Sequence, residues 1–194
     1  MTLTQEIRDR RVAVAEDVLL QLGRLDVPLR VRLGAAYISG VDHTGSAAYE
    51  GLNLDGDLKD QADLVQRNCA VCAVGALLLS KARVLNEVPM ADLVYAYPGV
   101  EKCFIAVGRE GTLRLLEDTF DDDTLNRVEA FFEASPMHIS PGHYRRAGMA
   151  AYGLSLSGSL SLSAARKRMI EIAENIVRNR GEFIVPAQYA IVDE

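Results

Sequence analysis

The sequence predicts a mainly helical protein with a single globular domain over residues 1–194, formed around a buried central helix with a few short strands. The first observation behind this prediction is an apolar run, CAVCAVGALLL, which extends from Cys69 to Leu79 between polar flanks. The second is the recurrence of apolar residues every three or four positions in other segments, as in amphipathic helices. The third is the composition, since 194 residues that are 49% hydrophobic are enough to bury one core.

The apolar run predicts the middle of a helix that spans about residues 60–87 and is buried on all sides. The run covers only roughly 16 Å of helix. A membrane-spanning helix needs about 20 apolar residues, so the run indicates a core helix and no membrane span. Small residues such as Ala70, Ala73 and Gly75 indicate that neighbouring helices approach this helix closely.

The segments before the central helix predict a helix, a short strand and a loop. Thr2 or Thr4 is expected to cap a first helix that Gly23 terminates. Apolar residues and arginines alternate at the start of LRVRLGAAYISG, residues 29–40, which predicts a short strand with one exposed face. Residues 41–60 are rich in glycine, aspartate, asparagine and serine, and we expect an exposed loop there.

The segments after the central helix predict several further elements. We expect a short helix at 90–97, a buried strand or helical turn at 103–107, and paired helices at 110–120 and 124–134. Ser163 is predicted to cap a final helix that Gly181 ends. Its inward-facing residues are expected to be Met169, Ile172, Ala173 and Ile176. Leucine and serine alternate in the preceding segment, 153–163, which predicts either a strand or a lid.

Charge and cysteine content restrict the classes of partner and the cellular location. The net charge of -6 disfavours a nucleic-acid-binding surface, which needs a clustered basic excess. The first residues are charged and no apolar segment follows them, so we expect no signal peptide. An odd number of cysteines, three, fits a reducing compartment. We therefore expect a cytoplasmic protein.

Two pairs of residues have the spacing of metal ligands, namely Cys69 with Cys72 and His138 with His143. The cysteines lie in the most apolar part of the chain, where cysteine packs as a small hydrophobic residue, so we expect no bound metal. A nucleophilic pair of Cys103 with either histidine has no local motif to support it. The aspartate-rich stretches lack the glycine and glutamate positions of a calcium-binding EF-hand loop.

An anion-binding site is the remaining chemical candidate. Serines precede the predicted start of the final helix, and two cations follow one turn later, an arrangement that suits phosphate. The segment lacks the lysine-serine ending of a nucleotide-binding P-loop and any GxGxxG pattern. The expected ligand-binding set is Ser161, Ser163, Arg166, Lys167, His138, His143 and Tyr144.

Two stretches carry a resemblance to other proteins. NCAVCAVGALLLS around the apolar run and ENIVRNRGEF near the C-terminus resemble sequences in a loose group of uncharacterised small helical proteins of bacteria and bacteriophages. Both stretches are packing motifs, so the resemblance implies no activity and no catalytic residue. It favours an accessory protein of a phage or mobile element.

These observations predict a binding protein without a cofactor. The sequence has no assembled acid-base set and no cofactor motif, which favours binding over catalysis. We expect a phage or mobile-element protein that engages a host protein, for example as an inhibitor of a defence component, and that forms a homo-oligomer. The first alternative is binding or hydrolysis of an anionic small molecule such as a nucleotide. The second alternative is a zinc-stabilised structural protein.

Overall fold

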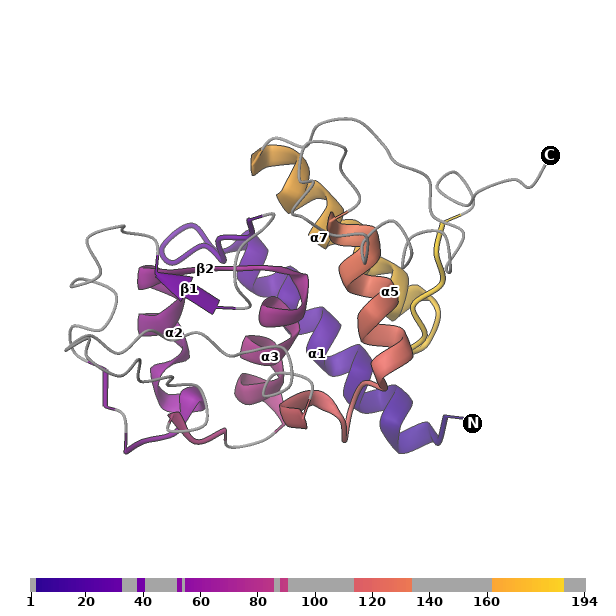
Figure 1. Cartoon of the computed structure of the whole chain (residues 1–194), viewed down its shortest axis with the longest axis horizontal. Coiled ribbons are helices and arrows are strands. Elements are labelled where there is room, and N and C mark those ends of the chain that lie inside the picture. Colours follow the sequence, from indigo (N-terminus) through magenta and orange to yellow (C-terminus); the bar gives the residue numbers. More distant parts are fainter. Residues whose placement is uncertain are drawn as a thin grey trace, which may run out of the picture.

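The computed structural model describes residues 3–32, 38–40, 52–53, 55–85, 88–90, 114–133 and 162–186. Their helices are α1 (Gln5–Gly23), α2 (Leu58–Asn68), α3 (Ala73–Val84), α5 (Asp122–Glu133) and α7 (Leu162–Arg178), and their strands are β1 (Ile38–Gly40) and β2 (Cys69–Val71) (Figure 1). The predicted mainly helical class is confirmed. The elements expected at 103–107 and 153–161 lie outside the described residues, as do most of those expected at 41–60 and 90–97.

Helix α1 runs diagonally across the fold (Figure 1). The Thr4 hydroxyl accepts a hydrogen bond from the Ile7 amide at 3.3 Å, so Thr4 is the cap, one of the two threonines that the sequence offers for this role. One face of α1 buries Val14, Val18 and Leu22, at the spacing of an amphipathic helix. α1 packs against α7 on one side and α3 on the other, and α5 contacts both of these helices (Figure 1).

The expected continuous helix over residues 60–87 is wrong in its middle. The chain leaves the helical conformation at Cys69, runs extended as β2, and enters α3 after Cys72. The prediction that the run is buried on all sides is confirmed, because every residue of 73–82 is buried. The break turns the chain back, so that α2 packs beside α3 instead of continuing its axis.

Strand β2 is extended because it finds backbone partners on both of its edges. It pairs antiparallel with β1, with Ile38 opposite Val71. On the other edge, the Val71 amide donates to the Arg30 carbonyl at 2.9 Å and the Arg32 amide donates to the Val71 carbonyl at 2.9 Å. A buried helix and a buried strand are equally apolar, so the sequence pattern does not separate them. None of the helices in the described residues is long and apolar enough to span a membrane.

The paired helices predicted around the three aspartates are half confirmed. α5 begins at Asp122, two residues before its predicted start, and buries Leu125, Val128 and Phe132 as expected. The helix predicted at 110–120 is wrong where the structure describes it, because helical conformation covers only 114–116 and a turn follows. In a continuing helix the Leu115 carbonyl would accept a hydrogen bond from a backbone amide of the next turn. Here it accepts a hydrogen bond from the Lys81 side chain of α3.

Helix α7 begins at Leu162, so the prediction that Ser163 caps it is wrong: Ser163 is the second residue of the helix. The four predicted inward residues are buried, as expected. It ends at Arg178, and the chain then reverses in a tight turn. The Arg180 amide donates to the Val177 carbonyl at 3.1 Å, and the Gly181 amide donates to the Ile176 carbonyl at 2.8 Å. Arg180 and Gly181 both have positive φ, 52° and 90°. This bonding pattern is a Schellman motif, in which the first of these residues takes the left-handed conformation that ends the helix.

Candidate functional site

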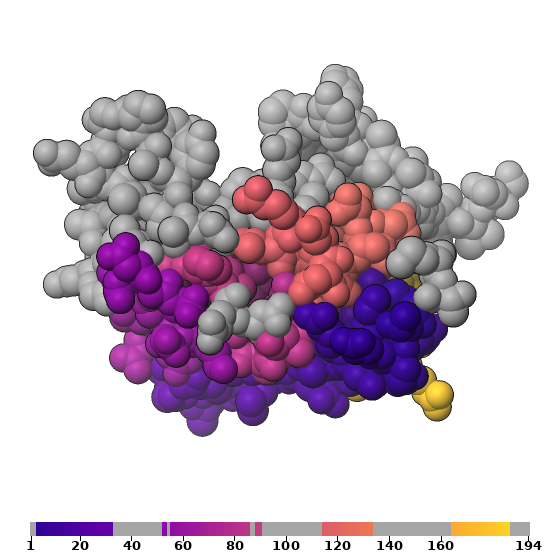
Figure 2. Space-filling view, turned by 90° about the horizontal axis from the view of Figure 1, so that it is seen from below, coloured from indigo at the N-terminus to yellow at the C-terminus, as the bar shows by residue number. Residues whose placement is uncertain are grey.

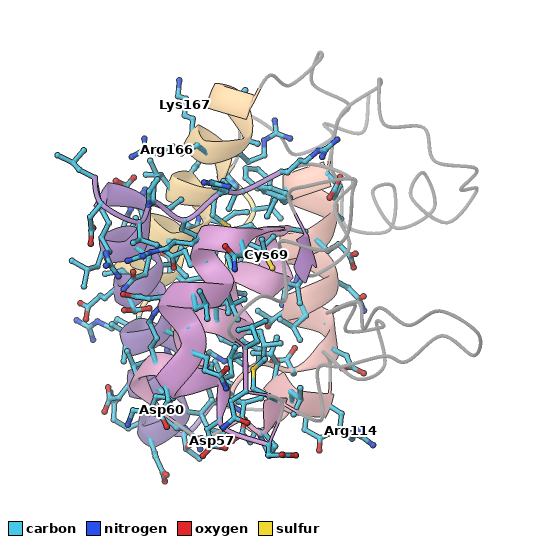
Figure 3. The ribbon with its side chains drawn as sticks, turned by 90° about the vertical axis from the view of Figure 1, so that its left-hand side faces the viewer. Asp57, Asp60, Cys69, Arg114, Arg166 and Lys167 are labelled. Atoms are coloured by element: carbon cyan, nitrogen blue, oxygen red, sulfur yellow. The ribbon has the colours of Figure 1, made fainter. Side chains whose placement is uncertain are left out.

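The predicted anion-binding residues do not gather into a site within the described part of the chain. Arg166 donates to the Leu22 carbonyl at 2.8 Å, so it neutralises the negative C-terminal end of α1. Lys167 is exposed on the outer side of α7. Figure 3 places both at the end of the molecule opposite Asp57 and Asp60. Ser161, His138, His143, Tyr144 and the side chain of Ser163 lie outside the described residues, so their role stays a prediction.

Cys69 and Cys72 are both buried and reduced, at opposite ends of the extended segment. Burial raises the pKa of each thiol to about 12, and for Cys72 the carboxylates of Glu129 and Glu133 add to this effect. Residues three apart in an extended chain are roughly 10 Å apart and point to opposite faces. In this conformation the two thiols therefore neither form a disulfide with each other nor ligate one metal ion together. Cys103, the third cysteine, lies outside the described residues.

Both described thiols are expected to resist alkylation in the folded protein. At a pKa of about 12 the thiolate fraction at neutral pH is on the order of 10⁻⁵. Iodoacetamide treatment at pH 7.5, followed by peptide mass mapping, should leave Cys69 and Cys72 unmodified. The same treatment in guanidinium chloride should label both. Labelling of either residue in the native protein would contradict this placement.

The described residues contain no group of three histidine, cysteine, aspartate or glutamate side chains that is arranged to hold a metal ion. The zinc alternative also needs His138 and His143, which lie outside those residues. The zinc alternative therefore stays a prediction, and the separation of the Cys69 and Cys72 thiols does not favour it.

An arginine-rich hollow of about 400 Å³ lies where the beginnings of α1 and α5 meet the segment after α7. Figure 2 shows the indigo surface of early α1 beside the salmon surface of residues 114–133, and Figure 1 shows the yellow segment after α7 on the same side. The residues that line the hollow are Leu3, Arg8, Arg11, Asp121, Thr124, Arg127, Glu182, Phe183 and Ile184. We call this the arginine hollow. Three arginines against two carboxylates make its lining net positive.

Arg11 forms the floor of the arginine hollow and is 2% exposed. Its Nη2 donates to Asp121 Oδ2 at 2.7 Å, and its Nε donates to the Thr119 carbonyl at 2.6 Å. Its Nη1 lies 3.4 Å from the Gly181 carbonyl, and the guanidinium covers the Phe120 ring at 5.3 Å. These contacts join α1, the start of α5 and the turn after α7. Arg11 is therefore a structural cation.

Asp121 shares its carboxylate between Arg11 and the start of α5. Its Oδ1 accepts from the Thr124 amide at 2.8 Å, which caps the helix. Partial burial raises the pKa of Asp121, but the hydrogen bonds from Arg11 and Thr124 outweigh this effect and lower the pKa to about 2. The carboxylate consequently stays ionised over the whole neutral and mildly acidic range.

Arg8 and Arg127 form the wall of the arginine hollow and are held less firmly than Arg11. Arg8 Nη2 pairs with Glu182 Oε1 at 2.7 Å, and its side chain is 26% exposed. Arg127 pairs with Asp123 at 2.8 Å, one turn back on the same helix, and its side chain is 33% exposed. Exposed ion pairs of this kind contribute only about 0 to 1 kcal/mol, so both guanidinium groups can exchange their partners.

A second hollow, of about 420 Å³, lies between α7 and the segment that follows it. Asn175 stands at its base and binds the backbone of Ile184 twice, donating to the carbonyl at 2.6 Å and accepting from the amide at 2.9 Å. Residues 182–186 are thereby fixed on α7, and they form part of the lining of both hollows. Asn175 therefore positions the wall that carries Glu182 and Ile184.

Sequence reasoning missed Arg8, Arg11 and Asn175 as residues that shape these hollows. Two signals were present in the sequence. Arg11 occupies the same face of α1 as Val14, Ala15 and Val18, so a charged residue interrupts an otherwise apolar stripe. Asn175 lies inside the last turn of α7, where asparagine is unfavourable unless its side chain has a partner.

The protein is thus mainly helical and carries the arginine hollow on its surface. No known protein family, curated protein or solved structure matches this chain.

Proposed function

We propose that this chain is a binding protein without catalytic activity, and that it engages another protein through the arginine hollow. The observation that supports this proposal is the pairing of exchangeable arginines with an exposed apolar rim. Arg8 and Arg127 stand beside Ile184, which is 52% exposed. Arginine is enriched at protein interfaces relative to the rest of a protein surface, and it is one of the residues that most often dominate the binding energy there.

Retention of a partner should depend on the two wall arginines. Three proteins are immobilised: the wild type, the double variant Arg8→Ala with Arg127→Ala, and the control Arg178→Ala. Each is incubated with a bacterial lysate, and the retained proteins are identified and quantified. Arg178 is an exposed arginine of α7 that lines the second hollow instead. Wild type and control should retain the same protein in equal amounts, and the double variant should retain about tenfold less or lower. Equal retention by all three, or self-association alone, would overturn the proposal.

We also propose a biological setting for this binding. The sequence resemblance supports a phage or mobile-element protein that acts in the cytoplasm on a host protein, as an inhibitor of a defence component. The proposal includes assembly as a homo-oligomer. The mass of the protein under native conditions, measured by mass spectrometry, tests the subunit number directly.

A small anionic molecule such as a nucleotide is the second candidate for the arginine hollow. The observation that favours it is the volume of about 400 Å³, which lies in the range of small-molecule pockets. Native mass spectrometry of untagged protein from a bacterial lysate separates the two candidates. A retained mass of nucleotide size that Arg8→Ala removes would favour the small molecule, whereas a retained protein would favour the first candidate.

A further inference from the structure

The chain itself places a carboxylate, that of Glu182, in the lining of the arginine hollow. Glu182 Oε1 accepts from Arg8 Nη2 at 2.7 Å, and the Glu182 side chain is 45% exposed. The contact joins residues 174 positions apart, so it forms only when the segment after α7 returns to the beginning of α1. A carboxylate is thus already bound to one of the two partly exposed arginines of the hollow.

The backbone fixes Glu182 in this place. Gly181 precedes it with φ of 90° and packs so closely on α1 that an added Cβ would lie 2.9 Å from both the Arg8 Cα and the Arg8 carbonyl oxygen. The Asn175 side chain holds Ile184 two residues later. Because the backbone is held at Gly181 on one side and at Ile184 on the other, the position of Glu182 beside Arg8 does not depend on the ion pair itself. The carboxylate can therefore leave Arg8 while the backbone around it stays in place.

Arg8 also has unused binding capacity. The structure gives one short bond to one Glu182 oxygen, whereas its Nε and Nη1 reach the carbonyls of Leu3 and Arg180 only at 3.4 Å. Bonds of this length are weak. A carboxylate that accepts two parallel bonds from one guanidinium is held more strongly than a carboxylate that accepts one.

We infer that Glu182 is an internal substitute for an acidic side chain of the partner, and that binding exchanges one carboxylate for the other on Arg8. This inference depends on the proposed function, because it assigns the partner's chemistry at the same hollow. It identifies the partner segment as acidic. The chain's net charge of -6 opposes the approach of any acidic segment, so such binding requires the local arginines.

Removal of the internal carboxylate should strengthen the binding of an acidic peptide. The full chain is titrated into fluorescein-labelled hexaglutamate at low ionic strength, and the dissociation constant is measured by fluorescence anisotropy. Glu182→Gln should bind about threefold to fivefold more tightly than the wild type, since an exposed ion pair must no longer be displaced. Arg8→Ala should bind about tenfold more weakly.

Glu174→Gln is the charge-matched control, because Glu174 is exposed on α7 and lies outside the lining of the hollow. It should change the affinity by less than about twofold. If Glu182→Gln and Glu174→Gln bound hexaglutamate equally well, while binding by the wild type still depended on Arg8, the inference would be wrong and the proposed function would stand. Binding of hexaglutamate that is the same for wild type and Arg8→Ala would instead count against the proposed function.

Inorganic pyrophosphate provides the second arm of this experiment, measured by isothermal titration calorimetry on the same variants. If Glu182→Gln tightens the binding of pyrophosphate but not of hexaglutamate, the carboxylate assignment is wrong and the hollow takes a small phosphate. Circular dichroism melting curves of all variants verify folding. Glu182→Gln should melt close to the wild type because the exposed pair contributes little to stability.

Discussion

Replacement of Gly181 by alanine is expected to lower the free energy of unfolding by at least about 3 kcal/mol. Two costs add at this position. The φ of 90° is unfavourable for any residue with a Cβ, and the new Cβ would lie 2.9 Å from backbone atoms of Arg8. Backbone atoms of a helix cannot move aside as a flexible side chain can. Relief of the overlap would displace the turn that carries Glu182 and the carbonyl that Arg11 binds.

Urea denaturation followed by circular dichroism measures this loss, and Gly23→Ala is the matched control. Gly23 is the last residue of α1, and an added Cβ there would meet no atom within 4 Å. That variant should be neutral or more stable by up to about 1 kcal/mol, because alanine favours the helix and restricts the unfolded chain. If both variants lost the same stability, the close approach of Gly181 to α1 would be refuted.

The amphipathic helices could be predicted from the sequence because their signal is local. In α1, α5 and α7 the buried residues recur at helical spacing, and Thr4 caps the first of them as expected. The extended segment at Cys69–Val71 could not be predicted in the same way. Its conformation depends on pairing with residues 30–32 and 38–40, which are distant in sequence, and its apolar composition suits a helix equally well.

The arginine hollow was missed for a related reason. The acceptors of Arg11 are 108 to 170 positions away in the chain, so no motif around Arg11 announces them. Serines and cations that are close together in the sequence predict a site at Arg166. Arg166 instead binds the C-terminal end of α1. Local clustering identifies loops that bind ligands, whereas this hollow forms only when three distant segments come together.

Replacement of Arg11 by methionine is the second large effect, with an expected loss of about 2–4 kcal/mol in the free energy of unfolding. Methionine conserves most of the apolar stem but removes the short bonds to the Thr119 carbonyl and to Asp121, together with the weaker contact with the Gly181 carbonyl. Arg10→Met is the control, since Arg10 pairs with Asp118 at 2.8 Å with side chains 25% and 42% exposed. The control should lose less than about 1 kcal/mol. Equal losses, measured by urea denaturation, would refute the structural role of Arg11.

The pH dependence of the loss in unfolding free energy separates the contribution of the Arg11–Asp121 ion pair from that of packing. In the wild type the pKa of Asp121 is lowered from 3.8 to about 2, so its contribution is complete above pH 4 and disappears as the pH falls through 2. Without Arg11 the pKa of Asp121 moves back toward 3.8 and this contribution shrinks. The stability difference between wild type and Arg11→Met should therefore narrow as the pH falls from 4 to 2. A difference that stays constant over this range would show that Arg11 acts through packing and carbonyl contacts alone, and would contradict the electrostatic part of its role.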